Sequence, residues 1–305
     1  MDVRRAYYGL MLARDMQYIG NDVIGKLQKG IEGVQRKIEA GDTSVEDADR
    51  LRLEIQRDEL LARIAEAKKG EAFAIAGLRF LTGVQTAFDI PDEPLTRPDV
   101  QLGPVVRYLT AARLFRADVN MARAGVVARK AFLDYQRAQL FPNIGLGLGF
   151  TYAIAPSAEP QNAAWLADPF NRFGSGFQFG MEWPLDFLPK QARISAAESQ
   201  LEEARALERL ALGGTAVEVE SAYATAVEAK TREENWERAE HRAKRWISSV
   251  QDAIDLGTKD ERFLIEPLRA YVFARALHAQ ALMDYYIALS ELARVTGWDA
   301  IAPPS

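Results

Sequence analysis

The side chains that most often perform catalysis or bind metals are scarce in this sequence of 305 residues. There is no cysteine, which excludes a disulfide framework, a cysteine nucleophile and a zinc site built on Cys and His. The two histidines, His241 and His278, lack a second histidine or a carboxylate nearby at a metal-ligand spacing, so we interpret both as structural. No Ser/His/Asp order, P-loop or dinucleotide-binding glycine motif is visible. The sequence therefore predicts no catalysis, no cofactor and no metal site.

Charge and hydrophobicity narrow the class further. A formal net charge of −5 argues against a nucleic-acid binder, which normally carries a basic excess. Hydrophobic residues make up 48% of the chain, enough for the core of one large or two ordinary domains. No apolar run approaches the roughly 20 residues of a membrane helix. The start, MDVRRAYYGLMLARDMQ, reads as the interior of an amphipathic helix, so no signal peptide is visible.

A repeat organises the helical part of the chain. A spacing of 216 residues pairs Gly41 with Gly257 and also pairs apolar residues that precede them. Beyond these glycines the spacing is 214 residues, and it pairs the Leu-x-x-x-Thr-Gly strings at 78–83 and 292–297. Glycines held in register at both ends of a helix are hard to attribute to chance. The sequence therefore indicates a duplicated unit.

Each copy predicts a helical hairpin with a tight turn. Residues 7–40 and 45–81 contain no proline and space their apolar residues by three and four. Gly41 lies where a helix C-cap is expected, and Asp42 to Ser44 offer N-cap candidates for the next helix. Residues 257–260 repeat this arrangement of a glycine followed by polar residues in the second copy. We also expect uninterrupted helices over residues 105–140 and 191–256, the latter with only Gly213 and Gly214 to bend it.

Residues 143–185 break the helical pattern. Large apolar residues alternate with small or polar ones from Asn143 to Ile154, and the alternation resumes before Pro184. The apolar face is continuous over about the 9–11 residues of a membrane strand. A soluble half-buried strand alternates as well, but an isolated hairpin needs a partner surface in water. The pattern favours a membrane hairpin whose lipid-facing residues are Ile144, Leu146, Leu148, Phe150, Tyr152, Phe177, Phe179, Met181 and Trp183.

The predicted fold is mainly α: long antiparallel helical hairpins of the coiled-coil or α-barrel type, with one inserted transmembrane-type β-hairpin. Four prolines between residues 91 and 104 mark a connector. The expected parts are the incomplete first-repeat hairpin (1–83), the connector (84–104), the long helices of the second repeat (105–142 and 186–297) and the β-hairpin (143–185).

This ordered set of elements resembles the TolC family of outer-membrane efflux and secretion channels. The string FPNIGLGLGFTY (141–152) looks like the family's passage into a strand. The string MEWPLDFLPKQARISAAESQLEEARA (181–206) looks like its passage from strand to long helix. Residues 219–297 resemble the last helical hairpin of the family.

The resemblance implies a homotrimeric channel in the outer membrane of a Gram-negative bacterium, with a β-barrel in the lipid and a periplasmic α-barrel. It also implies passive export of small molecules or proteins, with a periplasmic adaptor (membrane fusion) protein and an inner-membrane pump as partners. The rival interpretation is a soluble helical scaffold or adaptor carrying a small β tab, and neither interpretation involves nucleic acid.

One departure from the family concerns the β-hairpins. Family members have a strand hairpin in each repeat, whereas this sequence contains one. By the repeat spacing, the first hairpin would precede Met1, so we expect an N-terminally truncated chain. Three such chains would supply half of the family's strands.

By the same resemblance, the turns at Gly41 and Gly257 form the periplasmic tip, where acidic rings narrow the channel. Crowded carboxylates there would favour cations and raise one another's pKa. Alternatively, acids in a helix's first turn only complement the helix dipole. Glu266 matches a family gate acid by its spacing from Gly257. The cations of the tip, Lys259 and Arg262, would either pair with neighbouring tips or simply be solvated. The candidates at the tip are Asp47, Asp49, Asp260, Glu261, Glu266, Lys259 and Arg262.

Overall fold

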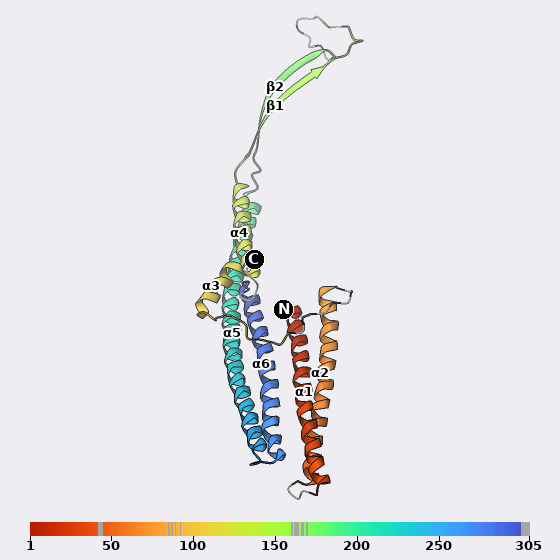
Figure 1. Cartoon of the computed structure of the whole chain (residues 1–305). Helices are drawn as coiled ribbons and strands as arrows, with labels where there is room; N and C mark the ends of the chain where they lie inside the picture. The colour runs from red at the N-terminus through yellow and green to blue at the C-terminus, as the bar shows by residue number, and fades with distance from the viewer. Residues whose placement is uncertain are drawn as a thin grey trace. The chain divides into compact units, whose positions relative to one another are not determined.

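The structure is a computed structural model that describes residues 1–41, 45–84, 86, 88, 90–91, 93–159, 161, 165, 168 and 170–299, with only the main chain of Glu261. Within these ranges it contains long helices and one two-stranded antiparallel sheet (Figure 1). The elements are α1 (Asp2–Glu39), α2 (Asp47–Thr82), α3 (Val105–Phe115), α4 (Ala117–Ala138), β1 (Asn143–Ala153), β2 (Arg172–Glu182), α5 (Phe187–Asp255), the 3-10 helix η1 (Glu261–Leu264) and α6 (Ile265–Thr296). This confirms a mainly α fold with one inserted β-hairpin.

The elements form two compact units. Residues 1–120 together with 212–305 form the first, which we call the helical unit. Residues 121–211 form the second, which we call the hairpin unit. The expected N-cap residues Asp42 to Ser44 lie outside the described residues.

The helical unit is built from two antiparallel helical hairpins, α1–α2 and α5–α6, with α1 also packing on α6 (Figure 1). Small residues of α5 permit close packing with α6, since alanine keeps the two backbones near each other. No helix in the described part of the chain combines the length and apolarity needed to cross a lipid bilayer. One core cluster joins α3, α5 and α6 through Tyr108, Ala112, Val219, Ala222, Ala226, Ala229, Tyr285, Ala288, Leu289, Leu292 and Val295.

The backbone conformation at the helix ends is the same in the two copies of the duplicated unit. Among the described residues, the four with positive φ are the four glycines that the repeat pairs. Gly41 and Gly257, at φ +74° and +70°, end α1 and α5. Gly83 and Gly297, at φ +71° and +67°, end α2 and α6. Glycine has no Cβ and adopts this left-handed conformation at little cost, so both copies use it to stop a helix.

The threonine before each closing glycine repeats the same cap. The hydroxyl of Thr82 donates to the Leu78 carbonyl at 2.7 Å and accepts from the amide of Val84. The hydroxyl of Thr296 donates to the Leu292 carbonyl, also at 2.7 Å, and accepts from the amide of Trp298. The Leu-x-x-x-Thr-Gly string is therefore a helix-ending device in both copies.

The helix expected over 105–140 is broken, so that expectation was wrong. Arg116 separates α3 from α4 and has an extended backbone with ψ 124°. Its guanidinium binds Asp118 at 2.8 Å, Glu218 of α5 at 2.7 Å and the Val295 carbonyl of α6 at 3.4 Å. No glycine or proline marks this break, which tertiary contacts of Arg116 stabilise. In contrast, α5 stays helical through Gly213 and Gly214.

In the hairpin unit, β1 and β2 pair antiparallel, with Leu146 opposite Phe179 and Leu148 opposite Phe177. Side chains of directly opposite residues share a face, so the large apolar residues of both strands lie on one side of the sheet. Gly147 and Gln178 face each other on the opposite side. Below the strands, α4 packs on α5 through Leu133, Ala197 and Leu201.

The α1–α2 hairpin packs so closely at Gly20 that a Cβ there would lie 2.5 Å from Ile64. We expect Gly20→Ala to lower the free energy of unfolding by about 1 kcal/mol, and by no more than about 2.5 kcal/mol. Overpacking costs about 1–3 kcal/mol, and the helical preference of alanine offsets about 0.5–1 kcal/mol of it. Gly25→Ala is the control, because that Cβ meets nothing within 4 Å. Urea unfolding of the full chain in detergent should show opposite signs, and equal effects would contradict the close approach.

Candidate functional site

Two helical turns lie at the same end of the helical unit (Figure 1). At Gly257 the amide bonds the Ile254 carbonyl at 2.8 Å and the amide of Thr258 bonds the Ala253 carbonyl at 2.9 Å. This is the Schellman pattern, which satisfies the last carbonyls of a helix. The amide of Gly41 makes the equivalent bond to Ile38 at 3.0 Å. Local hydrogen bonds thus end α1 and α5 at these two glycines.

The acids that follow the first turn take part in helix capping. Glu46, the N-cap of α2, and Asp49 form a reciprocal capping box, and the Asp49 carboxylate accepts from the Glu46 amide at 3.2 Å. Asp49 is buried, whereas Asp47 is exposed and pairs with Arg50 at 2.8 Å. In this chain Asp49 therefore fits the capping alternative better than an aperture ring, because its carboxylate is engaged within its own helix.

The second turn brings its charges together differently. Asp260 pairs with Arg262 at 3.3 Å, and the charged groups of Arg262 and Lys259 lie 5.4 and 5.7 Å from the centre of the Phe263 ring. Among the described residues, Glu266 in the first turn of α6 is exposed and has no ion-pair partner. The side chain of Glu261 lies outside the described residues. Glu266 is therefore the tip acid whose charge is most available.

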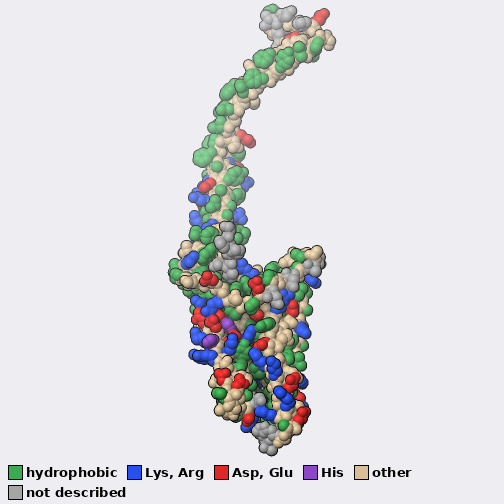
Figure 2. Space-filling view, in the orientation of Figure 1, with side chains coloured by type: hydrophobic (Ala, Val, Ile, Leu, Met, Phe, Trp, Pro, Cys, Tyr) green, Lys and Arg blue, Asp and Glu red, His purple; other side chains and the backbone are tan. Residues whose placement is uncertain are grey.

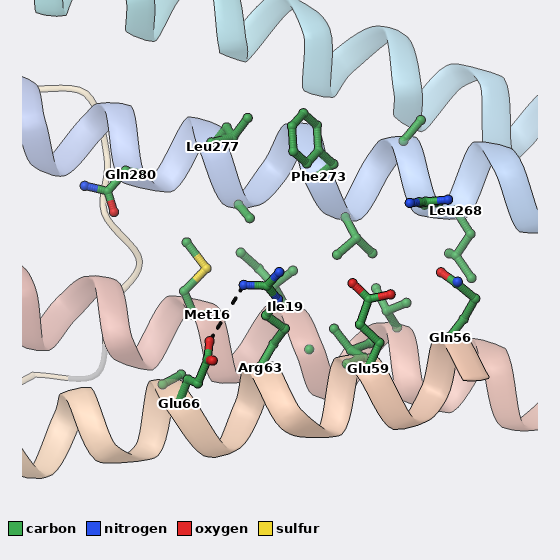
Figure 3. Close-up of a pocket in the computed structure, with 18 of the residues that line it drawn as sticks. Met16, Ile19, Gln56, Glu59, Arg63, Glu66, Leu268, Phe273, Leu277 and Gln280 are labelled. Carbon is green, nitrogen blue, oxygen red and sulfur yellow. Dashed lines mark ion pairs between the residues drawn. The ribbon is translucent and has the colours of Figure 1, made fainter. Parts of the chain in front are cut away.

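Glu266 also lies on the wall of a groove of about 990 Å³ between α1, α2 and α6. The groove has an apolar floor and a polar side formed by α2, whose Gln56, Glu59, Arg63 and Glu66 project from that helix (Figure 3). Arg63 and Glu66 form an ion pair at 3.7 Å. Residues of α6, among them Leu268, Phe273, Leu277 and Gln280, line the opposite wall (Figure 3). An amphipathic helix is the kind of partner that such a groove accepts.

The apolar face of the β-hairpin is open along its whole length, and Figure 2 shows hydrophobic side chains following the strands. Nine residues of this face are each 55–72% exposed: Ile144, Leu146, Leu148, Phe150, Tyr152, Phe173, Phe177, Phe179 and Met181. A contiguous apolar surface of this kind marks an interface with protein or lipid. Phe173 was missed by the sequence reasoning because β2 begins at Arg172, earlier than the alternation seemed to resume.

Trp183 lies just beyond β2, so the expectation that it is a strand residue was wrong. β2 ends at Glu182. The indole Nε1 of Trp183 donates to the Leu140 carbonyl at 3.0 Å, and its ring packs edge-on against Phe187. Trp183 therefore ties together the two chain segments that enter and leave the hairpin. Pro184 directly after it ends the strand, since proline offers no amide to continue the ladder.

His278 has no carboxylate at a metal-ligand spacing in the sequence, but the fold brings two carboxylates to its ring. Its Nδ1 lies 2.6 Å from Glu240 and its Nε2 3.2 Å from Glu233, both on α5. These partners are 38 and 45 residues away in sequence, so local spacing could not reveal them. Glu233 is only 1% exposed and also binds Arg97 of the connector. Within the described residues no group of His, Asp and Glu side chains is arranged to hold a metal ion.

The outer membrane efflux protein family matches residues 109–298 of this chain. Because the match spans more than half of the chain, the protein belongs to the outer membrane efflux protein family. This confirms the resemblance to TolC-type channels. Members of the family are channels and not enzymes, which agrees with the expectation of no catalysis. No curated protein matches the sequence significantly.

Several solved structures share this fold. A membrane protein from Pseudomonas aeruginosa is 19% identical, with a TM-score of 0.66 over 97% of this chain and 67% of its own. The outer-membrane channel OprN is 18% identical, with a TM-score of 0.65 over 97% of this chain and 65% of its own. The open MtrE outer membrane channel of Neisseria gonorrhoeae is 16% identical, with a TM-score of 0.65 over 97% of this chain and 65% of its own. This chain thus spans about two thirds of their length, and the likeness shows the fold.

Proposed function

We propose that this chain is one protomer of a homotrimeric outer-membrane channel. The channel would export small molecules or proteins passively, within a tripartite efflux or type I secretion system. The observation that carries this proposal is the open apolar face of β1–β2 in a member of the outer membrane efflux protein family. Two strands cannot close a barrel, so the hairpin needs strands from other chains to satisfy its edges in lipid.

The proposal places the β-hairpin in the outer membrane of a Gram-negative bacterium and the helical unit in the periplasm. Family members work with adaptors and inner-membrane pumps. We assign the same partners to this chain, with the adaptor contributing an amphipathic helix to the groove between α1, α2 and α6. The apolar floor and the charged α2 wall of that groove support this assignment.

Cell fractionation and crosslinking test the proposal. Because the chain has no cysteine, one introduced cysteine is a unique crosslinking site. We expect the full chain to be found in the outer-membrane fraction and to crosslink as a trimer, and Glu59→Cys to crosslink to the adaptor. Cells that lack the chain should retain a fluorescent export substrate, and its return should restore export. A monomer confined to the soluble fraction would favour the helical scaffold with a β tab and overturn the channel.

Glu266 should make the pore prefer cations. We expect Glu266→Gln to lower the ratio of potassium to chloride permeability by a few-fold. A water-screened charge contributes at most about 1 kcal/mol to a nearby ion. Reversal potentials of the reconstituted full chain measure the effect. Asp47→Asn is the control, because Asp47 is already paired with Arg50. An equal loss of selectivity in both variants would show that Glu266 does not set the ion selectivity of the aperture.

A further inference from the structure

A charge cluster centred on the buried Glu233 joins three parts of the helical unit: the connector, α5 and α6. Arg97 of the connector donates to Glu233 at 2.9 Å and to Glu237 at 2.8 Å. His278 of α6 lies between Glu233 and Glu240 of α5. Glu233 is shared, because one carboxylate oxygen contacts Arg97 and the other contacts His278. The family assignment does not account for this cluster.

The position of His278 between two carboxylates fits a ring that carries two protons. An ionised carboxylate can only accept hydrogen bonds, and both ring nitrogens of His278 face one. A neutral imidazole has a single N–H, so one of its nitrogens would direct a lone pair at a carboxylate oxygen. Arg97 donates a charge-assisted hydrogen bond to the Glu233 carboxylate, and the pKa of Glu240 is lowered mainly by its hydrogen bond with His278. The complete set of bonds therefore belongs to the imidazolium form.

We propose that His278 is a pH-dependent link that fastens α6 and the connector to α5 when its ring is protonated and loosens them when it is neutral. Loss of the second proton leaves one carboxylate oxygen without its donor, and on the buried Glu233 an unpaired oxygen is costly even though Arg97 still binds the other oxygen. Other charged or titratable groups act on the cluster from each neighbouring element: Arg97 on the connector, Glu234, Glu237 and Lys244 on α5, Arg275 and Tyr285 on α6, and Asp22 on α1, which acts on Arg275.

The link matters because the connector bridges the two helical hairpins. In addition to the Arg97 bonds, a second residue of the connector contacts α6. The Tyr286 hydroxyl donates a hydrogen bond to the Thr96 carbonyl at 2.9 Å. On its other side, the amide of Leu95 donates to Asp15 of α1 at 3.0 Å. Weakening the hold on Glu233 therefore weakens a segment that ties α1 to the α5–α6 hairpin. This inference concerns the helical unit and stands apart from the proposed channel.

The pH window follows from the direction of the shifts. Burial lowers the pKa of His278, but the hydrogen bonds to Glu240 and Glu233 outweigh it and leave the pKa above its ordinary value of 6.5. The stabilisation is fully present below 6.5 and is lost as the pH rises through the folded-state value. The lowered pKa of Glu240 acts oppositely, and its contribution is lost as the pH falls from 4.5 toward the folded-state value. The link is therefore strongest between about pH 4.5 and 6.5.

NMR titration of the full chain in detergent tests the protonation. There are two histidines in the sequence, and the exposed His241 is a natural control. The signal that disappears in His278→Gln should titrate above pH 6.5, and Glu240→Gln should lower its pKa. A His278 signal that titrates at or below 6.5 would overturn the proposal.

Hydrogen exchange tests the mechanical consequence. After correction for the intrinsic pH dependence of exchange, the Leu95 amide should lose protection between pH 6 and pH 9. Each unit of pKa difference changes the opening equilibrium about tenfold. The loss should vanish in His278→Gln and persist in His241→Gln. Equal pH dependence in all three proteins would mean that His278 does not control the connector, whatever the chain's activity.

Discussion

Leu148→Arg is expected to prevent stable insertion of the β-hairpin into lipid. Leu148 lies near the middle of β1, opposite Phe177, on the exposed apolar face. If that face meets the hydrocarbon core, an arginine near the bilayer midplane costs roughly 2–4 kcal/mol per chain. Phe179→Arg on the paired strand should act in the same way. Folding of the full chain into lipid vesicles, followed by urea titration, measures the cost.

The matched control for Leu148→Arg lies on the same sheet. Gln178 is exposed and pairs with Gly147, so its side chain belongs to the small and polar face. Gln178→Arg adds the same charge to the side that the channel proposal turns away from lipid. We expect this variant to insert nearly as well as the unmodified chain. Insertion of Leu148→Arg as efficiently as Gln178→Arg would rule out the lipid-facing assignment and favour the soluble β tab.

Gly297→Ala is expected to destabilise the helical unit by about 2–5 kcal/mol. Gly297 has φ +67°, and forcing an L-residue into this region costs roughly 1–2 kcal/mol. In addition, its Cβ would lie 2.9 Å from the carbonyl oxygen of Phe115, at the end of α3. Backbone atoms cannot move aside as a side chain can, so a steric cost of about 1–3 kcal/mol is added. Urea unfolding of the full chain in detergent measures the sum.

The duplication supplies a control for this substitution as well. Gly83 closes α2 with φ +71°, yet its Cβ would meet nothing within 4 Å. Gly83→Ala should therefore show the backbone cost alone, about 1–2 kcal/mol. The difference between the two variants isolates the packing of α3 against the end of α6. Identical losses would show that this approach contributes nothing to stability.

Local patterns were sufficient to predict most of the elements. The period of the apolar residues predicted the helical hairpins, and a glycine that must adopt positive φ marked each of their ends. The two-residue alternation predicted which strand residues share a face, and the pairing of Ile144 with Met181 and of Leu146 with Phe179 agrees with it. These features depend on backbone geometry within a few residues, so they can be read without the fold.

The tertiary structure decided which residues that are distant in sequence come into contact. Arg116 interrupts a helix-forming stretch because Glu218 and Val295 lie within reach of its guanidinium. His278 meets two carboxylates because α5 and α6 run side by side, and Glu266 faces a groove because α2 lies near α6. Such pairings join residues tens to hundreds of positions apart, and local periodicity carries no information about them. The sequence by itself thus determined the elements and their apolar faces, and the packing of the helices decided which charges meet.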